Sequence, residues 1–276
     1  MVKKKTAIRA LVYIIITTHV LIIIFPFIWM GYSSFKTNPE FFASVWSLPE
    51  SLSFENIRNA WGTGALGRYI TNSVVVTIGA VTITLIVAVL GGFSLGFHSA
   101  KWMSFAKRAF IFAMAVPPYV SLVPLVITLR NLNLLDTRLG LILPTAAFNV
   151  PMSVFIMRSF FLAIPREVEE AAYVDGATPL QAFGRVILPL AKPAIFTVAI
   201  LNVIWVWNEF LFALVIVTKP SLKTLPVGLR DFVGEHITHY PVMLSAILIA
   251  VLPALVIFVV FRRQIVAGLS AGAVKG

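Results

Sequence analysis

The sequence predicts an all-α membrane protein with six transmembrane helices, and its composition and hydropathy carry this prediction. The 276 residues are 59% hydrophobic and 12% charged, with a mean hydropathy of +0.94, whereas soluble domains usually carry about 25% charged residues. A helix needs about 20 mainly apolar residues to cross a bilayer. Six stretches reach this length, and we expect them to form a single domain over residues 1–276: 8–31, 69–97, 106–129, 139–161, 193–217 and 242–262.

Local features support the predicted spans in order. The first apolar run is too long for the h-region of a cleaved signal peptide and has no A-x-A-like site after it, so we expect it to be retained. Gly92 and Gly96 in the second span form a small-xxx-small pair, which is typical of close helix packing. The third and fourth spans contain prolines, which predict kinks that neighbouring helices can tolerate: Pro117, Pro118, Pro124, Pro144 and Pro151. The fifth span contains the acidic residue Glu209, and the sixth ends at Arg262.

Basic residues near the span ends predict the orientation of the chain, because cytoplasmic loops are enriched in Lys and Arg. With the N-terminus inside, 14 of the 22 Lys and Arg residues lie on the cytoplasmic side. Both termini are therefore expected in the cytoplasm, together with the polar segment 164–192 between spans four and five. The loops 32–68 and 218–241 are expected to face outward.

Charge and motif content exclude several classes of function. The net charge of +11 does not indicate nucleic-acid binding, because the basic residues flank apolar runs and form no single stripe. The chain has no cysteine, which excludes disulfides, thiolate metal sites and cysteine nucleophiles. It also lacks a G-x-x-x-x-G-K-[ST] loop. We therefore expect no cofactor in this chain, and any ATP that drives it must be bound by a partner.

The first half of the polar segment is predicted to form a helix that ends at a glycine. Pro165 suits the first turn of a helix, and the acidic residues that follow complement the helix dipole: Glu167, Glu169 and Glu170. Val168, Ala171 and Ala172 share one face, where the small alanines would let another protein approach closely. Gly176 suits the left-handed position that ends a helix.

The second half of the polar segment is predicted to form another helix. Thr178, Pro179 and Gln181 match a capping box with proline at the first helical position. An apolar face follows at helical spacing, consisting of Leu180, Phe183, Ile187 and Leu190. Pro189 is expected to stop or kink this helix. On these residues alone, a hairpin that only covers the end of the bundle is an equal alternative to a docking element.

The polar segment resembles the EAA motif of ABC importer permeases. The match consists of Glu170-Ala171-Ala172, then Gly176, and then Val186-Ile187-Leu188-Pro189, with valine where the family pattern has isoleucine. Other stretches resemble the maltose-type, carbohydrate-uptake branch of this family. They are "SSFKTNPEFF", "SFENIRNAW", Asn72-Ser73, "LNLLDTRLGLILP", "WNEFLFALV" and "RRQIVAGLSAGAVKG".

The resemblance implies a type I ABC importer permease in the cytoplasmic membrane of a prokaryote. It implies a coupling helix that docks on an ATPase subunit through Glu167, Glu170, Ala171, Ala172, Asp175 and Gly176. Leu188 and Pro189 would set the return into the membrane. The implied partners are a second permease subunit in a heterodimer, two ATP-binding subunits that hold ATP and Mg²⁺, and an extracytoplasmic binding protein that delivers a sugar or oligosaccharide. The chain itself is expected to be no enzyme.

A candidate substrate path lies in the fifth span around Glu209. An acidic residue within a span usually faces a cavity or a partner, and Trp205, Asn208 and Phe212 are expected on the same helical face. Aromatic, amide and carboxylate groups could hold a sugar, although Glu209 could equally pack between helices. Asn202, and Asn149 with Ser153 in the fourth span, are further candidates, for which helix–helix hydrogen bonds are the alternative.

Two other classes of function are considered and disfavoured. A secondary transporter would need ionisable residues for ion coupling and usually has internal repeats; neither a second intramembrane acid nor a repeat is evident. A membrane serine hydrolase could use "GFSLG" at 92–96 with His98, but the nucleophile elbow needs a strand-to-helix turn. "GTGALG" at Gly62, Gly64 and Gly67 lacks a βαβ context, and the His236–His239 pair lacks a third metal ligand.

Overall fold

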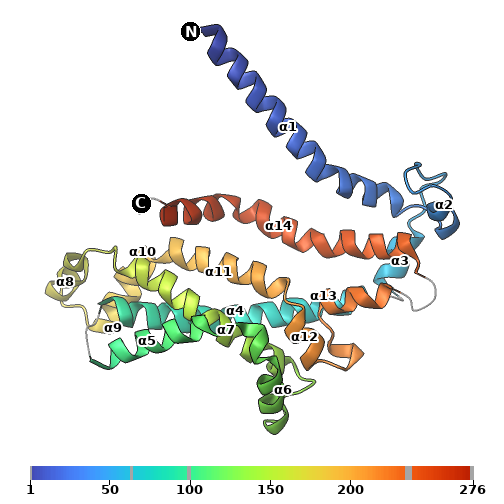
Figure 1. Ribbon diagram of the computed structural model, residues 1–276. Helices are drawn as coiled ribbons and strands as arrows, with labels where there is room; N and C mark the ends of the chain where they lie inside the picture. The colour runs from blue at the N-terminus through green and yellow to red at the C-terminus, as the bar shows by residue number, and fades with distance from the viewer. Residues whose placement is uncertain (1, 63–64, 98–100, 234–237, 274–276) are drawn as a thin grey trace. The chain divides into compact units, whose positions relative to one another are not determined.

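The computed structural model describes residues 2–62, 65–97, 101–233 and 238–273, and none of these residues lies in a β-strand. The all-α prediction is confirmed. The long helices are α1 (Val2–Ser33), α4 (Leu66–Phe97), α5 (Lys101–Ala115), α6 (Leu122–Asn131), α7 (Arg138–Phe161), α11 (Lys192–Trp207) and α14 (Tyr240–Ala273). Figure 1 shows these helices with the shorter ones between them.

The shorter elements lie in the connections. Four are short α-helices before or after long ones: α2 (Asn38–Ala43), α3 (Glu55–Trp61), α12 (Leu211–Ile216) and α13 (Leu225–Gly228). Three more belong to the polar segment: α8 (Arg166–Val174), α9 (Pro179–Ala182) and α10 (Leu188–Leu190). The single-turn elements are η1 (Pro118–Ser121), η2 (Phe183–Ile187), η3 (Pro220–Leu222) and η4 (Leu229–Phe232).

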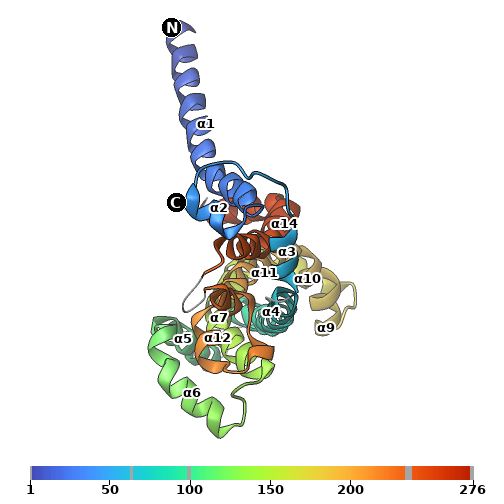
Figure 2. The same ribbon diagram turned by 90° about the vertical axis from the view of Figure 1, so that its right-hand side faces the viewer.

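Helix length and hydropathy agree with a membrane protein. Four described helices are long and apolar enough to cross a bilayer, within α1, α4, α7 and α14. Two bent helix pairs raise the count to as many as six. The third predicted span, 106–129, is broken, because α5 and the stretch from Pro118 to Asn131 meet at 89°. Figure 2 shows α5 and α6 running in different directions. Pro117 and Pro118 explain the break, because proline lacks the N–H that would continue the helix.

The fifth predicted span also differs from the structure. α11 ends at Trp207, residues 208–210 are not helical, and α12 is a separate helix. Trp205, Asn208, Glu209 and Phe212 therefore do not share one continuous helical face. A uniform 3.6-residue period cannot detect such a break, because the sequence on both sides of it is equally apolar.

The chain forms two compact units, of which unit 1 comprises 1–68 with 228–253 and unit 2 comprises 69–227 with 254–276. The helices α4 and α14 each run from one unit into the other. The single domain over residues 1–276 stays a prediction.

Unit 1 is organised around a buried lysine after α1. Lys36 is 0% exposed, and its ammonium donates to the carbonyl oxygens of Ser44 (2.9 Å) and Val45 (3.2 Å) and to the Ser47 hydroxyl (3.3 Å). The side-chain amide of Asn56 donates to the backbone carbonyls of Ser34 and Lys36, both at 2.8 Å. A buried ammonium is tolerated when its three donors find acceptors, so these bonds define the path of the loop.

Close helix packing forms the core of unit 2. A Cβ at Gly92 of α4 would lie 2.6 Å from the Met157 Cβ and 2.9 Å from the Arg158 backbone nitrogen of α7. The predicted packing role of Gly92 is confirmed. Gly96 is part of the same contact, because its Cβ would lie 3.2 Å from the Phe161 Cβ. Glycines thus let the two helix backbones approach each other.

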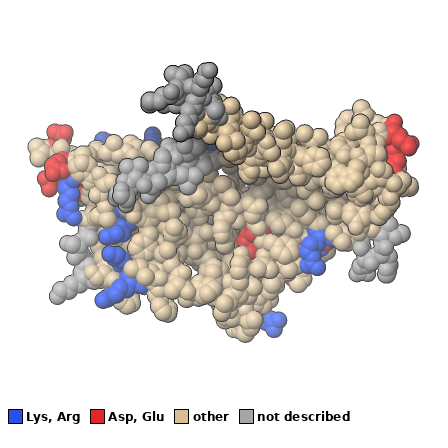
Figure 3. All heavy atoms as spheres, turned by 45° about the horizontal axis from the view of Figure 1, so that its top comes forward, with Lys and Arg blue, Asp and Glu red and all other residues tan. Residues whose placement is uncertain are grey.

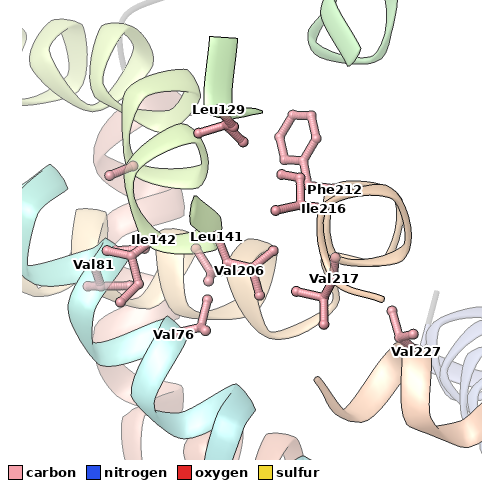
Figure 4. Close-up of a cluster of buried hydrophobic side chains, with 13 residues drawn as sticks. Val76, Val81, Leu129, Leu141, Ile142, Val206, Phe212, Ile216, Val217 and Val227 are labelled. Carbon is pink, nitrogen blue, oxygen red and sulfur yellow. The ribbon is translucent and has the colours of Figure 1, made fainter. Parts of the chain in front are cut away.

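Two hydrophobic clusters fill unit 2. The α12 cluster joins α4, α6, α7 and the end of α11 to α12 and α13, and its labelled side chains converge in Figure 4. It contains Val76, Ala80, Val81, Leu129, Leu141, Ile142, Ala146, Val206, Phe212, Ala213, Ile216, Val217 and Val227. The α10 cluster joins α4, α7 and the start of α11 to the polar segment. It contains Ala88, Leu95, Phe97, Val154, Met157, Phe161, Ile187, Ala191, Ala194 and Val198.

Candidate functional site

The first helix of the polar segment ends in a glycine turn, as the sequence predicts. Gly176 has a φ of +83°, a backbone conformation that side chains with a Cβ disfavour. The Gly176 N–H donates to the Tyr173 carbonyl (3.0 Å) and the Ala177 N–H donates to the Ala172 carbonyl (2.9 Å). These two bonds form a Schellman motif. No heavy atom lies within 4 Å of the position a Gly176 Cβ would take, so backbone conformation alone requires glycine here.

The second helix begins at the predicted capping box. The Thr178 hydroxyl accepts from the Gln181 N–H (3.4 Å), and the Gln181 side-chain oxygen accepts from the Thr178 N–H (2.9 Å). Pro179 occupies the first helical position. Pro165 differs slightly from its prediction, because it is the residue before the first turn of α8 and not part of that turn. The gap between the two helices is therefore short and well defined.

A π-helical turn interrupts the second helix at Phe183–Ile187. The Leu188 N–H donates to the Phe183 carbonyl, five residues earlier. Pro189 follows, and its ring would clash with the carbonyl four residues before it in a regular α-helix; a wider turn relieves that clash. The extra residue rotates the helix face, so Leu180 is 79% exposed whereas Ile187 is 0% exposed. The predicted common apolar face of these two residues is therefore wrong.

Leu188 and Pro189, the predicted return into the membrane, lie in the single turn of α10. The stretch from Pro179 to Leu190 meets α11 at an angle of 68°. Phe183 anchors this stretch on α4, because its ring centroid lies 4.6 Å from that of Phe93. The polar segment is thus packed against α4 through Phe183.

The predicted docking residues do not all face outward. Glu167, Glu170, Ala171, Asp175 and Gly176 are exposed. Ala172 is buried and its side chain lies on the inner face of α8, where partly buried Val168 packs on the α10 cluster. Acidic side chains gather at the edge of unit 2 that carries α8 (Figure 3).

Two apolar residues near the glycine turn are exposed, of which the sequence analysis named only Leu180, and that as part of a packing face. Val174, two residues before Gly176 in the sequence, is 87% exposed. Leu180, four residues after Gly176, is also exposed. An isolated exposed apolar residue is ordinary, but these two lie on the two helices that the glycine turn joins, where a partner protein could cover them. The sequence signal for the exposure of Val174 is its position beside the charged residue Asp175, at the predicted end of the helix.

The candidate path residues make hydrogen bonds within the chain. Asn202 is buried, and its side-chain amide donates to the Ser153 hydroxyl of α7 (2.9 Å) and to the Val198 carbonyl (2.8 Å). The helix–helix bond considered for Asn202 and Ser153 is therefore present. Asn149 donates to the Thr145 carbonyl and Asn208 to the Ile204 carbonyl, both at 2.8 Å. Trp205 is exposed near the end of α11.

Glu209 is buried in the break between α11 and α12. One carboxylate oxygen accepts from the Phe212 N–H (2.7 Å) and the other from the Ala213 N–H (3.0 Å). Both donors belong to the first turn of α12, whose N–H groups have no partner within the helix. The carboxylate thus caps α12, and a role in sugar contact stays a prediction.

A second polar network also escaped sequence reasoning. It joins Asn72 and Ser73 at the start of α4, and Asp136 and Arg138 before and in α7, to residues 218–225 after α12. Asn72 and Ser73, like Asp136 and Arg138, stand in stretches that resemble a permease family, but no physical role was attached to them. Partners so distant in sequence cannot be paired by local pattern.

Other motifs carry no site in the described part of the chain. Ser94 lies inside α4, which does not provide a nucleophile elbow. No group of three His, Asp or Glu residues suited to a metal occurs among the described residues. Gly64, His98 and His236 lie outside the described residues.

Comparison with known sequences identifies the family. Residues 88–270 match the model of the family described as binding-protein-dependent transport system inner membrane component. The chain is 35% identical over 265 residues to the probable ABC transporter permease protein YurM of Bacillus subtilis, covering 96% of this chain and 88% of that protein. It is 34% identical over 253 residues to the diacetylchitobiose uptake system permease protein NgcG of Streptomyces coelicolor, covering 91% of this chain and 84% of that protein.

A solved structure has the same fold. The chain superposes with a TM-score of 0.81 on a chain of a bacterial ABC transporter involved in the import of the acidic polysaccharide alginate. The two chains are 23% identical, and the superposition covers 94% of this chain and 97% of the other. This likeness supports the type I importer arrangement of the helices.

Proposed function

Because this chain belongs to the family of binding-protein-dependent transport system inner membrane components, we propose that it imports a sugar or oligosaccharide with energy supplied by partner ATPases. The observation that carries the proposal is the rigid hairpin of α8, Gly176 and α9. Its exposed tip combines acidic residues, small residues and the apolar pair Val174 and Leu180. A tip of this kind suits a groove on a soluble partner, and the family membership supports an ATP-binding subunit as that partner.

Coupling follows from how the hairpin is attached. Gly176 and the Thr178 capping box fix the two short helices to each other. Phe183 and Ile187 fix the hairpin to the α10 cluster, which includes residues of α4, α7 and α11. When two ATPases close on ATP, each carries a hairpin with it, and the attached helices move as one. This opens the path toward the loaded binding protein.

The orientation and the partners form the finer part of the proposal. We place both termini and the polar segment in the cytoplasm, following the excess of basic residues on that side. A second, related permease would complete the path as a heterodimer. ATP and Mg²⁺ would be bound by the two ATPase subunits, and this chain would bind no cofactor.

The cargo class follows from relatives of different specificity. Besides the diacetylchitobiose system, the chain is 36% identical over 235 residues to the trehalose transport system permease protein SugB of Mycobacterium tuberculosis, covering 83% of this chain and 84% of that protein. Both of these relatives serve carbohydrate uptake. An aromatic residue, Trp205, and the amide of Asn208 near the end of α11 are the groups in this chain best suited to a sugar.

The test is ATP-driven uptake by the assembled transporter in proteoliposomes. The permease is purified with its neighbouring transporter subunits and the binding protein encoded beside it, and uptake of labelled trehalose and of chitin and starch oligosaccharides is measured. We expect at least one of these sugars to accumulate only with ATP and the binding protein. Absence of ATP-dependent uptake for every sugar would contradict the proposed cargo class.

A variant of the hairpin tests the coupling role. Gly176→Lys forces a side chain into a left-handed backbone conformation and places a charge at the exposed tip. We expect sugar uptake to fall at least about tenfold, because roughly 1.4 kcal/mol of lost docking is enough for that. Gly184→Lys is the matched control: its Cβ would also have no neighbour within 4 Å, but its backbone is helical. Uptake by Gly176→Lys within twofold of wild type would contradict coupling through this hairpin.

A further inference from the structure

The connection after α2 folds back along the end of α1 (Figure 1). Three side chains at intervals of three and four residues, Trp29, Tyr32 and Lys36, reach this connection from α1 and from the turn after it. The Trp29 indole N–H donates to the Val45 carbonyl (3.1 Å), and the Tyr32 hydroxyl donates to the Trp46 carbonyl (3.3 Å). One face of α1 thus binds a stretch of irregular backbone.

Lys36 completes the pairing of this backbone. Its ammonium donates to the carbonyls of Ser44 (2.9 Å) and Val45 (3.2 Å), so the carbonyls of three successive residues, 44–46, all have donors from the α1 side. A loop in water does not need such donors, because water supplies them. Where water is scarce, an unpaired carbonyl costs free energy, and irregular backbone is tolerated only where protein pairs its polar groups. The loop meets this condition.

The position of Trp46 along α1 indicates its depth in the bilayer. Its ring stacks on the Phe25 ring, with centroids 6.0 Å apart and planes at 27°. Phe25 lies eight residues before Ser33, where α1 ends, and eight residues span about 12 Å along a helix. The apolar span Ile8–Ser33 has 26 residues, which makes it about 39 Å long, whereas the hydrocarbon core is about 30 Å thick. Each end of the span therefore extends about 5 Å into the headgroup layer, and the Trp46 ring reaches the acyl chains.

The loop also presents an apolar outer surface. Trp46, Leu48 and Phe42 are exposed, and residues 41–49 contain no charged side chain. Residues 8–28 of α1 are exposed as well, so the apolar surface of the loop continues the surface of a span. Trp is enriched where acyl chains meet headgroups. Lipid is therefore the occupant that fits this surface.

We propose that residues 44–48 form an interfacial anchor, embedded in the bilayer surface at the Ser33 end of α1. The backbone of this anchor loop lies in the headgroup layer against α1, and Trp46 and Leu48 enter the boundary of the acyl chains. Lys36, which is 0% exposed, is the positioning residue, because it pairs the carbonyls from the protein side and does not touch lipid. This placement depends neither on the sugar cargo nor on the coupling role.

Spin-label accessibility distinguishes lipid from water and from protein. The chain contains no cysteine, so Leu48→Cys introduces its only thiol and keeps the Trp46 ring. The assembled transporter is labelled in nanodiscs of phosphatidylethanolamine and phosphatidylglycerol, and the signal of the same transporter without the introduced thiol is subtracted. Collision of the label with oxygen, which concentrates in acyl chains, is compared with collision with the water-soluble nickel ethylenediaminediacetate complex. We expect oxygen to collide more often.

Position 55 provides the matched reference. Glu55, an exposed acid in the first turn of α3, lies outside the anchor loop, so the label in Glu55→Cys should report water. The oxygen-to-nickel ratio is expected to be several-fold higher at position 48. Low collision with both reagents at position 48 would mean that a protein, such as a second permease, covers the loop, and would overturn the proposal. A ratio equal to that at position 55 would place the loop in water and would overturn it as well.

A second test addresses the positioning role of Lys36. Lys36→Met keeps an unbranched side chain of similar length but removes the ammonium that binds the Ser44 and Val45 carbonyls. Hydrogen bonds from a charged group are the stronger ones, so we expect the ratio at position 48 to fall toward that at position 55. Lys219→Met, which removes an exposed lysine outside the loop, should leave the ratio unchanged. A ratio that Lys36→Met does not change would overturn the positioning role.

Tyr32→Phe keeps this test decisive if Lys36→Met folds poorly. It removes only the hydroxyl that donates to the Trp46 carbonyl and keeps the ring, whose centroid lies 5.5 Å from the Lys36 ammonium. We expect a smaller shift of the ratio toward water, because a neutral hydroxyl is a weaker donor than an ammonium. An unchanged ratio in Tyr32→Phe would contradict placement of the loop by carbonyl pairing, even without a result for Lys36→Met.

Discussion

At the scale of single residues, several buried polar side chains of unit 2 bind other parts of the same chain. Asn202 bridges α11 to Ser153 of α7, and Glu209 caps α12. Buried polar groups are expected to be hydrogen-bonded, because an unpaired one costs free energy. A polar residue in an apolar stretch therefore indicated a structural role correctly. The sequence alone could not distinguish such a residue from one that contacts a substrate.

Replacing Glu209 is expected to loosen α12. In Glu209→Gln one oxygen still accepts from the first turn, whereas the amide nitrogen cannot, so the free energy of unfolding should fall by about 1 kcal/mol, the usual contribution of a helix cap. Thermal unfolding of the purified transporter in detergent measures this. Glu55→Gln, an exposed acid in the first turn of α3, should change stability by less than about 0.5 kcal/mol. Equal effects of the two variants would show that the cap contributes nothing.

Local rules predicted the residues of the polar segment well. Gly176 and the Thr178–Gln181 capping box are where the sequence places them, because both features depend on a few neighbouring residues. Ala172 was predicted to be a docking residue and is buried, whereas Leu180 was predicted to lie on an apolar face and is exposed. Local pattern cannot predict this, because the direction of these side chains depends on the π turn and on packing against α4 and α7. The structural roles of Asn72 and Asp136 were missed because these residues bind partners more than 80 positions away, at Ser221 and Thr218.

At the scale of elements, α4 and α7 depend on glycine for their contact. Gly92→Ala would place a Cβ 2.6 Å from the Met157 Cβ and 2.9 Å from a backbone nitrogen. A backbone cannot yield as a flexible side chain can, so we expect a loss of about 2–3 kcal/mol in the free energy of unfolding, typical of an overpacked core.

Gly91→Ala provides the comparison for that variant. Its Cβ would meet only the flexible side chain of Val154, with Cγ2 at 3.3 Å and Cγ1 at 3.6 Å, and alanine favours a helix over glycine by about 1 kcal/mol. The two effects nearly cancel, so its thermal unfolding midpoint should stay close to that of wild type. Finding Gly91→Ala as damaging as Gly92→Ala would refute the assignment of the close contact to Gly92.

The predicted spans illustrate what hydropathy can and cannot locate. It placed the apolar spans within α1, α4, α7 and α14 to within a few residues, because each lies in one long helix. Hydropathy alone does not show the breaks within spans three and five. Pro117 and Pro118 predicted a kink in span three, where the helix bends, whereas the break of span five beside Glu209 was not predicted. Fold class is thus accessible from composition, whereas the direction of each broken span depends on tertiary contacts.

At the scale of the whole molecule, acid should weaken the chain through Asp136. Hydrogen bonds from the Thr218 hydroxyl and from the Lys219 and Thr218 N–H groups hold the pKa of Asp136 below its usual value. A carboxyl group with a lowered folded-state pKa stabilises the fold above its unfolded pKa of about 3.9. That contribution is lost as the pH falls through the lowered value.

The thermal unfolding midpoint of the transporter in nanodiscs, measured from pH 7 to pH 3, should show this dependence. Wild type should exceed Asp136→Asn by a constant margin at neutral pH, and the margin should shrink below about pH 4. Asp175→Asn, which removes an exposed acid, should follow wild type at every pH. A margin between wild type and Asp136→Asn that does not depend on pH would show that the carboxylate charge is not what holds residues 218–219.

The π turn at Phe183–Ile187 contributes one extra residue between the hairpin and α11. The orientation of α11 therefore depends on how many residues this stretch contains. Each residue of an α-helix turns the chain by about 100°, so one residue more or fewer between the capping box at Thr178 and the start of α11 would rotate α11 relative to the hairpin. The Asn202 side chain would then turn away from Ser153. Insertions and deletions in this stretch should therefore be far less tolerated than substitutions, a constraint on its evolution that a scan of single substitutions would not reveal.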